Sequence, residues 1–151
     1  MILIVLFISI MIILILINYL SYEAFEDTEY PYLFSINEIS KSPIGYRGVF
    51  ASKDYKKGDI LEVCPCIKQE YKNISGRIKD YVFSFDKKHV LIAFGYCSMY
   101  NHSDDPNASW QILSENQMLI IVEKDIKKGE EIFVSYGEGY WEQRNENKNK
   151  V

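Results

Sequence analysis

Polar side chains of a few types gather in the C-terminal third of this 151-residue chain and indicate a functional site. Asn, His, Ser, Tyr and Gly recur there in loops between apolar runs, where binding residues are more common than core residues. Because the ordinary pKa of a phenol is ~10, a tyrosine in such a site would be a neutral hydrogen-bond donor rather than a strong base. The groups are Asn101–Ser103, Pro106–Asn107, Gly129–Ile132, Ser135–Gly137 and Tyr140–Trp141.

The elements that would position these residues are short strands. Runs of about five residues, rich in Val, Ile, Phe and Tyr, alternate with turns that contain Gly, Asn, Asp or Lys-Lys-Gly. Only Ile74–Phe85 and Ala93–Tyr100 offer room for a short helix, so the domain is predicted to be mainly β. The predicted strands are Tyr32–Ile36, Gly48–Ala51, Ile60–Cys66, Val90–Phe94, Ala108–Leu113, Met118–Val122 and Glu131–Val134.

One segment of the chain recurs further along. Ala51–Val63 aligns with Val122–Val134, and Lys, Asp, Lys, Lys, Gly and Val stand at matching places in the two copies. Each copy is predicted to be a strand, a polar turn closed by glycine, and a second strand. Two such corners so far apart indicate a fold with an internal pseudo-twofold axis rather than a tandem array. Chance matching of two lysine-rich turns is the alternative.

The N-terminal segment is distinct from the rest. Residues 2–17 are Ile, Leu, Val, Phe and Met, interrupted only by Ser9, and no Lys or Arg precedes Lys41. About 20 residues of helix cross the ~30 Å hydrocarbon core of a bilayer, so residues 1–20 are predicted to be a transmembrane helix that contacts lipid through residues 2–20. An uncleaved signal segment is the alternative. Residues 21–34, aromatic and then acidic, would form a juxtamembrane tether.

Net charge and cysteine content restrict the classes of function that remain. The net charge of −4 argues against a groove that binds nucleic acid through phosphate contacts. The three cysteines, Cys64, Cys66 and Cys97, fit neither a disulfide framework nor a structural zinc site with four ligands, and no metal is expected. Buried thiols on strands are predicted instead, in a reducing compartment.

Three blocks of the sequence resemble the signature blocks of SET-domain protein lysine methyltransferases, in the same order and with similar spacing: Lys41–Ala51, Asn101–Asn107 and Gly129–Gly137. The similarity extends over roughly residues 35–144 and is closest to the minimal SET proteins of large DNA viruses, which lack flanking zinc modules. It implies a mainly β, β-clip-like SET domain over residues 35–144, in which the chain forms a pseudoknot. Residues 145–151 would be a polar tail.

The resemblance also implies S-adenosylmethionine as the methyl donor and a protein lysine as the acceptor, which would meet in a narrow channel from opposite faces. Tyr136 matches the catalytic tyrosine, which also borders the cofactor, and Tyr81 matches a channel tyrosine that would assist it. Asn101 and His102 match the cofactor-binding pair. The loop that receives the cofactor is matched by Gly45, Tyr46, Arg47 and Gly48.

Several of these positions leave alternatives open. Tyr46 stands where the family has a glycine, so either the loop shifts by one residue or cofactor affinity is reduced. Trp110 falls near the position that tunes how many methyl groups are added, where its bulk would favour a monomethyl product, or it packs in the core. Tyr140 and Trp141 either wall the channel or cover an edge of the core. For Tyr136, packing at a strand end is the alternative to catalysis.

Three N-glycosylation sequons bear on which side of the membrane the domain lies: those of Asn73, Asn101 and Asn107. A glycan on Asn101 would cover the cofactor site, and the methyl donor belongs to the cytosol. A single-pass membrane protein with a cytoplasmic domain is therefore predicted. The acidic stretch after the span counts weakly against this orientation, because cytoplasmic flanks prefer Lys and Arg.

The function predicted from the sequence is methylation of a protein lysine. A histone tail is the first substrate to consider, and a viral or membrane-proximal protein is the other. The alternatives are a membrane-tethered SET-fold binding module without turnover and an exported structural module behind a signal segment. A homodimer is left open, and direct binding of nucleic acid is not expected.

Overall fold

The computed structural model describes residues 10–14, 31–44 and 47–142 of the chain, which divides into two units, Met1–Pro31 and Tyr32–Val151. Residues 10–14 of the first unit are helical. No helix in the described ranges is long and apolar enough to cross a bilayer. Most of the predicted transmembrane helix at 1–20 and of the tether at 21–34 lies outside the described residues. The second unit contains the predicted domain at 35–144.

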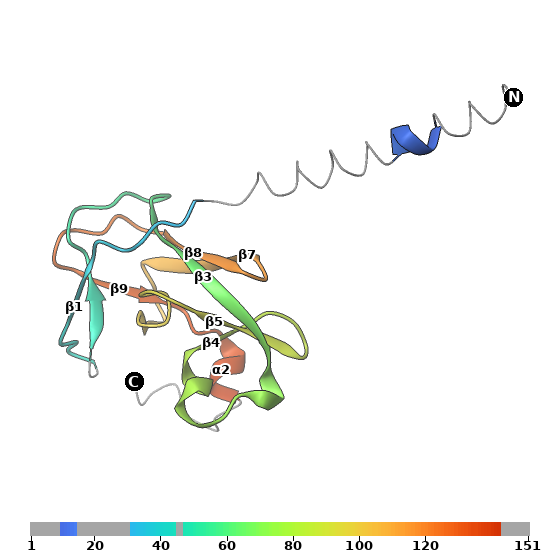
Figure 1. Ribbon diagram of the computed structural model, residues 1–151. Coiled ribbons are helices and arrows are strands. Elements are labelled where there is room, and N and C mark those ends of the chain that lie inside the picture. The colour runs from blue at the N-terminus through green and yellow to red at the C-terminus, as the bar shows by residue number, and fades with distance from the viewer. Residues whose placement is uncertain (1–9, 15–30, 45–46, 143–151) are drawn as a thin grey trace, which may run out of the picture. The chain divides into compact units, whose positions relative to one another are not determined.

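The second unit is built from two β-sheets (Figure 1). One sheet has the strand order β1-β2-β9-β6 and the other has the order β4-β5-β3-β8-β7. Only β6 and β9 pair in parallel among the strands that the structure describes, and this pairing leaves β9 between β2 and β6. The prediction of a mainly β domain is confirmed, whereas the pseudoknot stays a prediction. The bounds are β1 Glu38–Ser40, β2 Gly48–Phe50, β3 Ile60–Glu70, β4 Val82–Ser84, β5 His89–Ala93, β6 Asn101–His102, β7 Ala108–Ser114, β8 Gln117–Val122, β9 Glu131–Val134, the 3-10 helices η1 Tyr71–Asn73 and η2 Gly76–Tyr81, and α2 Glu138–Glu142.

Six of the seven predicted strands are present close to their predicted bounds, and the first one is not. The prediction of a strand at Tyr32–Ile36 is wrong, because this run meets a neighbouring strand at one point only, the bridge between Leu33 and Val63. Phe34 beyond the bridge is 70% exposed. The apolar composition of the run therefore reflects neither burial nor regular pairing, and β1 begins only at Glu38.

Of the two segments that offered room for a short helix, one contains a 3-10 helix and the other contains a turn. Ile74–Phe85 holds the 3-10 helix η2 and then β4, which pairs with β5 in antiparallel register. Ala93–Tyr100 leaves β5 and turns at Gly95, whose φ of 92° is one that a residue with a side chain rarely adopts. The prediction of a short helix is thus confirmed in the first segment, whereas a glycine turn takes its place in the second.

The two copies of the duplicated segment contact each other symmetrically, which confirms the predicted pseudo-twofold. Tyr55 and Ile126, which are equivalent in the two copies, exchange backbone hydrogen bonds of 2.8 and 3.0 Å. Gly58 and Gly129 close the two turns with φ angles of 92° and 85°. Two equivalent ion pairs cross between the copies: Lys56 with Asp125 at 2.6 Å and Lys127 with Asp54 at 2.9 Å.

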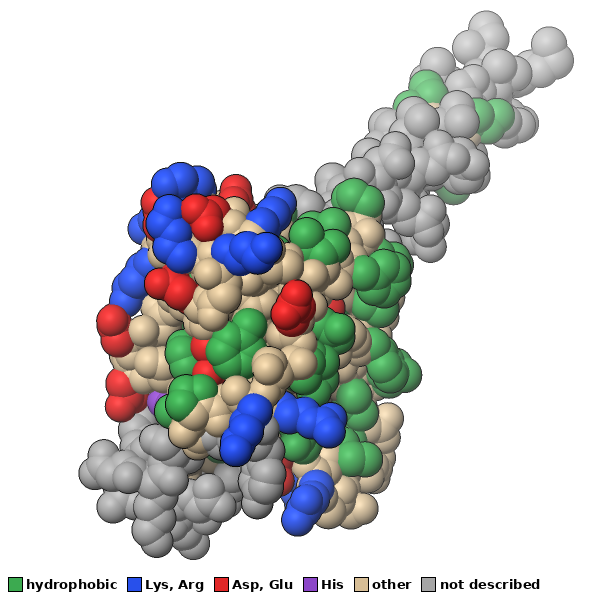
Figure 2. Space-filling model, turned by 90° about the vertical axis from the view of Figure 1, so that its left-hand side faces the viewer, with side chains coloured by type: hydrophobic (Ala, Val, Ile, Leu, Met, Phe, Trp, Pro, Cys, Tyr) green, Lys and Arg blue, Asp and Glu red, His purple; other side chains and the backbone are tan. Residues whose placement is uncertain are grey.

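A single core lies beneath both sheets and packs side chains from each. Val49 and Ile132 from the first sheet join Leu91, Met118 and Ile120 from the second, and all five are fully buried. Acidic and basic side chains are interspersed on the face shown in Figure 2, with hydrophobic side chains exposed between them. The core thus fixes the two sheets relative to each other within this unit.

The prediction of three buried thiols on strands is correct for one cysteine and wrong for the other two. Cys66 is a buried free thiol on β3. Cys64, also on β3, forms a disulfide with Cys97, which lies in the turn after β5. The fold brings the Cα atoms of the pair to 6.5 Å although the residues are 33 positions apart. That proximity depends on the turn at 95–100, which local sequence patterns do not reveal.

Candidate active site

A single cavity of about 920 Å³ brings together predicted site residues from distant parts of the sequence. Arg47 precedes β2, Tyr81 ends η2 and Asn101 begins β6. Trp110 extends from β7, and Tyr136 follows β9. The last two predicted channel residues that line it, Tyr140 and Trp141, lie on the short helix α2. Seven predicted residues, contributed by segments that span most of the domain, therefore share one cavity.

Tyr136 is held at both ends. Its hydroxyl donates a hydrogen bond of 3.0 Å to the backbone carbonyl of Tyr100. Its backbone N–H donates one of 3.1 Å to Nδ1 of His102, so Nδ1 is an acceptor and the ring proton of a neutral His102 lies on Nε2. That Nε2 faces the carboxylate of Asp104 at 3.3 Å. Burial first, and then the neighbouring Tyr140, Tyr81 and Glu131, raise the pKa of Tyr136, so its phenol stays protonated at neutral pH.

Aromatic rings surround Tyr136. Its ring centroid lies 4.7 Å from that of Tyr140, 5.3 Å from that of His102 and 6.2 Å from that of Trp141, to which it is stacked. Trp141 also meets His102 edge-on at 5.1 Å and is only 5% exposed. Both C-terminal aromatics thus line the cavity and Trp141 is also buried, while their roles in a substrate channel stay predictions.

Asn101 is fixed by two acceptors. Its side-chain N–H groups donate to the backbone carbonyl of Arg47 at 2.9 Å and to Glu131 at 2.7 Å. The carboxylate of Glu131, which is buried, also accepts a hydrogen bond of 2.9 Å from the hydroxyl of Ser42. A Cβ atom on Gly48 would lie 1.9 Å from that carboxylate, so glycine is required for this approach. Because both amide hydrogens are engaged, Asn101 can offer a ligand only its oxygen, which is an acceptor.

The SET domain family model matches residues 46–137 of the chain, which include Asn101, Glu131 and Tyr136. The chain belongs to the SET domain family. It is 28% identical over 117 residues to the Schizosaccharomyces pombe histone-lysine N-methyltransferase specific for H3 lysine-37, covering 74% of this chain and 80% of that protein. It is 29% identical over 100 residues to the Aspergillus terreus histone-lysine N-methyltransferase set9, covering 62% of this chain but only 16% of that longer protein.

A solved structure supports the same assignment. The crystal structure of a Plasmodium falciparum protein assigned as a histone methyltransferase has 35% sequence identity to this chain and a TM-score of 0.64. The match covers 72% of this chain and 99% of that one. Family membership and these relatives identify the chain as a protein-lysine methyltransferase with a mainly β SET fold.

Two residues of the SET domain have structural roles that sequence reasoning did not assign. Glu131 orients Asn101, as described above, and Asn107 fastens the strand that carries Glu131. The Asn107 side chain donates a hydrogen bond of 2.9 Å to the backbone carbonyl of Glu131. It also accepts one of 2.8 Å from the backbone N–H of Phe133. Both residues stand inside the motif blocks. Each is a polar residue directly beside an apolar strand run, and that position is the sequence signal that could have indicated a structural role.

Of the remaining predicted residues, two line the cavity and two lie outside the described residues. The indole N–H of Trp110 donates a hydrogen bond of 2.9 Å to the backbone carbonyl of Ser135. The ring of Trp110 contacts that of Phe83 edge-on, with 5.3 Å between the centroids, and both residues line the cavity. Tyr81 is 54% exposed and lines the same cavity. Gly45 and Tyr46 lie outside the described residues. The roles assigned to these residues stay predictions.

The cavity of this SET domain suits S-adenosylmethionine. Its volume lies in the range of small-molecule sites, roughly 300–1,000 Å³. The oriented oxygen of Asn101 would accept a hydrogen bond from the cationic amino group of the cofactor. Gly48, which lacks a Cβ, lets the loop backbone lie close to Asn101 and Glu131. Asn101 and the segment Arg47–Gly48 are therefore the residues that would hold the cofactor.

Proposed function

We propose that this SET domain transfers a methyl group from S-adenosylmethionine to the side-chain nitrogen of a lysine in a protein, with a histone tail as the first substrate to test. The observation that carries the proposal is the hydroxyl of Tyr136, which is fixed by the carbonyl of Tyr100 on the wall of the cavity that Asn101 also lines. The specificity of the Schizosaccharomyces pombe relative for lysine-37 of histone H3 supports a histone as the first candidate.

The residues of the cavity suit the acceptor lysine. An ammonium has no lone pair, so the lysine must be neutral before it can accept a methyl group. Tyr136, Trp110 and Tyr140 give the cavity aromatic walls, and burial between such walls lowers the pKa of a lysine because it disfavours the charged form. The cavity therefore favours the form of the substrate that can react.

Tyr136 can orient that amine. Its hydroxyl hydrogen is engaged by the carbonyl of Tyr100, so its oxygen presents lone pairs to the cavity. Those lone pairs would accept an N–H of the lysine and leave the nitrogen lone pair free to point elsewhere. The cofactor, when bound, supplies an electrophilic methyl group on a sulfonium. The contribution of this chain is then chiefly to position the amine for in-line transfer.

We further propose that Trp110 limits the product to monomethyl-lysine. The indole is fixed to the carbonyl of Ser135 and to the ring of Phe83, so it has little freedom to withdraw from the cavity wall. A larger methylated nitrogen would then meet a ring that cannot retreat. Mass spectrometry of the product from the wild type and from Trp110→Phe tests this, because the smaller ring should allow a second methyl group.

We also propose that residues 1–20 anchor the protein in a membrane and that the SET domain faces the cytoplasm. The apolar run at 2–17, which only Ser9 interrupts, supports an anchor, and the sequon at Asn101, a residue of the cavity, supports the cytoplasmic side. A membrane-proximal or viral protein is then the alternative substrate, consistent with the resemblance to minimal viral SET proteins. A shift in mass with endoglycosidase after expression in eukaryotic cells would refute the cytoplasmic placement.

The decisive test combines cofactor binding with methyl transfer. The full chain in detergent is incubated with labelled S-adenosylmethionine and either mixed histones or a cell extract, beside Tyr136→Phe and the control Tyr32→Phe. Tyr32 is half exposed and does not line the cavity. We expect Tyr136→Phe to lower turnover on the order of a hundredfold with calorimetric cofactor affinity preserved, and Tyr32→Phe to match the wild type.

Two outcomes would contradict the proposal. Equal labelling by Tyr136→Phe would remove the role given to its hydroxyl. A folded wild type that binds no cofactor would favour the binding module without turnover.

A further inference from the structure

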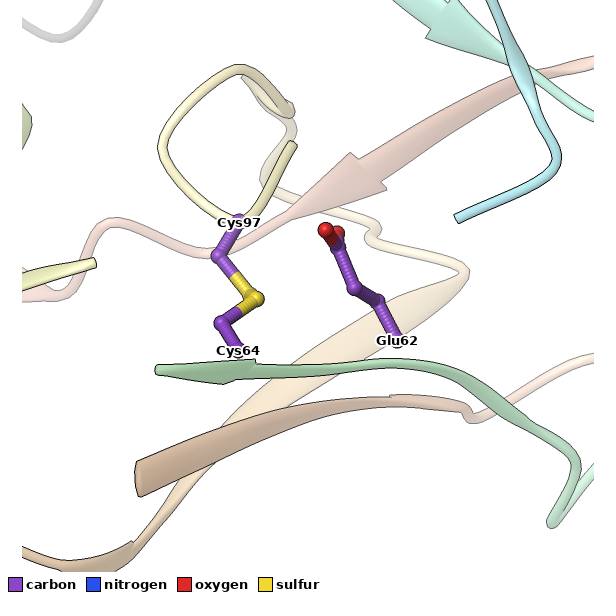
Figure 3. Close-up of side chains that lie close together, drawn as sticks. All are labelled: Glu62, Cys64 and Cys97. Carbon is purple, nitrogen blue, oxygen red and sulfur yellow. A yellow bond between two sulfur atoms is a disulfide. The ribbon is translucent and has the colours of Figure 1, made fainter. Parts of the chain in front are cut away.

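A disulfide joins the core of the domain to the turn that precedes the active-site strand β6. Cys64 belongs to β3, and Cys97 belongs to the turn at 95–100, which leads into Asn101 (Figure 3). Both sulfurs are buried, but Cys97 also lines the active-site cavity, whereas Cys64 does not. Both ends of the disulfide therefore lie in the core, and the Cys97 end also borders the cavity.

The turn at 95–100 contacts both tyrosines assigned to the reaction. The hydroxyl of Ser98 lies within hydrogen-bond distance of the backbone carbonyls of Tyr81, at 3.3 Å, and Ala93, at 3.2 Å. The carbonyl of Tyr100 accepts the hydroxyl of Tyr136 at 3.0 Å. A displacement of this turn would therefore move the acceptor that fixes Tyr136 and a contact that supports Tyr81.

A buried carboxylate completes the attachment of the turn. Glu62 on β3 accepts hydrogen bonds from the N–H of Tyr96 at 2.8 Å and the hydroxyl of Tyr100 at 3.4 Å. A Cβ on Gly95 would lie 2.3 Å from this carboxylate, so the turn is shaped closely around it. The carboxylate oxygen and the two sulfurs all lie within 4.8 Å of one another. Figure 3 shows the Glu62 side chain beside the disulfide.

The disulfide sets how close the turn lies to β3. A bond between the two sulfurs holds them ~2 Å apart, whereas two thiols are not bonded and must stand further from each other. After reduction, the turn keeps the hydrogen bonds that Glu62 accepts from Tyr96 and Tyr100, but it loses its covalent link to β3. Reduction should therefore loosen the turn.

We propose that Cys64 and Cys97 form a reversible thiol–disulfide site that controls methyl transfer by fixing or releasing the turn at 95–100. In the oxidised state the turn holds Tyr136 and Tyr81 in place, and in the reduced state it loosens and the transfer slows. This inference rests on the proposed function for its readout. Cys66, two residues along β3 from Cys64, takes no part.

A glutathione-type disulfide is the oxidant that completes the step. The thiolate of Cys97, which borders the cavity, attacks one sulfur of the oxidised glutathione, forms a mixed disulfide and expels one glutathione thiolate. The thiolate of Cys64 then attacks the Cys97 sulfur, forms the protein disulfide and expels the second glutathione thiolate. The two protons lost by the cysteines are taken up by the two glutathiones, and two electrons pass from the protein to the oxidant.

The experiment measures methyl transfer by the full chain in glutathione buffers that range from oxidising to reducing. Mass spectrometry after thiol alkylation reports the state of each cysteine in the same samples. We expect kcat to fall about fivefold or more on reduction, in step with loss of the Cys64–Cys97 disulfide, and cofactor affinity to change less. Cys66→Ser is the matched control and should keep the full redox response.

The double variant Cys64→Ser with Cys97→Ser should lose the response and show the low kcat of the reduced wild type in every buffer. If it does not fold, the titration of the wild type alone still decides. A disulfide that breaks without any change in kcat would overturn the proposal, as would a reduced protein that carries zinc on Glu62, Cys64 and Cys97. A protein with no activity in any buffer and no cofactor binding would instead refute the proposed function. In that case hydrogen exchange of residues 95–100 in the two redox states tests whether the disulfide fixes the turn. Equal protection in both states would overturn the proposal that it does.

Discussion

The side-chain amide of Asn101 donates a hydrogen bond of 2.7 Å to the buried carboxylate of Glu131. The second hydrogen of the amide goes to the backbone of Arg47, so the carboxylate and the loop backbone together fix which atom Asn101 presents to the cavity. Glu131 lies on β9 and Arg47 directly before β2, two paired strands. The geometry of Asn101 thus depends on the register of this sheet.

Replacement of Glu131 by Gln should weaken cofactor binding without unfolding the domain. A glutamine keeps one acceptor oxygen but presents an N–H₂ group to either Asn101 or Ser42, so one buried hydrogen bond is lost. Such a loss costs about 1–2 kcal/mol, which corresponds to roughly a 5- to 30-fold increase in the cofactor Kd. Calorimetric titration measures it. Glu130→Gln, at the exposed neighbouring position, should leave the Kd unchanged, and an unchanged Kd in Glu131→Gln would sink the role given to this carboxylate.

Gly48→Ala should disturb the same cluster from the other side. The new Cβ would stand 1.9 Å from the Glu131 carboxylate and 3.0 Å from the amide nitrogen of Asn101, so Glu131 must leave its partners. We expect a loss of about 1–3 kcal/mol in the free energy of unfolding, together with weaker cofactor binding. Thermal denaturation checks the first effect. Gly139→Ala is the comparison for stability, because a Cβ there meets no atom within 4 Å; equal melting temperatures would contradict the prediction.

The buried carboxylate of Glu62 should make the stability of the oxidised protein depend on pH. Burial raises the pKa of Glu62 from 4.5 to about 7, against the lowering effect of the hydrogen bonds from Tyr96 and Tyr100. Between these pH values the folded state retains a proton that the unfolded state releases. This group therefore lowers the free energy of unfolding as the pH rises from about 4.5 to 7, by on the order of 3 kcal/mol.

Urea denaturation at pH 5 and pH 8 isolates this contribution. The side chain of Glu62→Gln cannot ionise, so its stability should not fall as the pH rises. The free energy of unfolding of the variant minus that of the wild type should therefore be larger at pH 8 than at pH 5. Glu115→Gln, a change at an exposed carboxylate paired with Lys68, should not. A difference between Glu62→Gln and wild type that is the same at both pH values would show that Glu62 does not titrate in this window.

The pseudo-twofold predicts that equivalent substitutions have equal effects. Asp54 accepts the backbone N–H of Lys128 and pairs with Lys127, and Asp125 makes the matching contacts with Lys57 and Lys56. Asp54→Asn and Asp125→Asn should therefore lower the melting temperature by similar small amounts, and high salt should reduce both effects because the pairs are exposed. Scanning calorimetry at low and high salt measures this. A large effect of only one of the two would contradict the equivalence.

Sequence patterns predicted strands well where a short apolar run is buried in the core. For example, Ile60–Cys66 and Met118–Val122 are buried at most of their positions. The run at Tyr32–Ile36 has a similar composition but forms only one β-bridge in the described structure, to Val63. Composition carries no information about how long two segments stay paired. The pseudo-twofold was predictable because the segment that forms each half, Ala51–Val63 or Val122–Val134, occurs twice in the sequence.

The site was predictable to the extent that its motifs name residues, but the contacts that orient those residues were not. Asn101 and Tyr136 were identified from their motif blocks. Glu131 and the carbonyl of Tyr100 were not, because their roles depend on distances across the fold. The disulfide was missed for the same reason. An odd number of cysteines argues against a framework of several disulfides, yet it does not exclude one pair brought together by a turn.

The reciprocal contacts of the two duplicated turns also set the order in which the domain can assemble. Among the described residues, Asp54 bonds to Lys127 and Lys128, and Asp125 bonds to Lys56 and Lys57. Each turn therefore depends on the other for part of its hydrogen bonds. Contacts between segments this far apart in the chain require closure of a long loop, which slows folding. We therefore expect the crossing of the two turns to be a late event in folding, after the hairpin of β7 and β8 has formed.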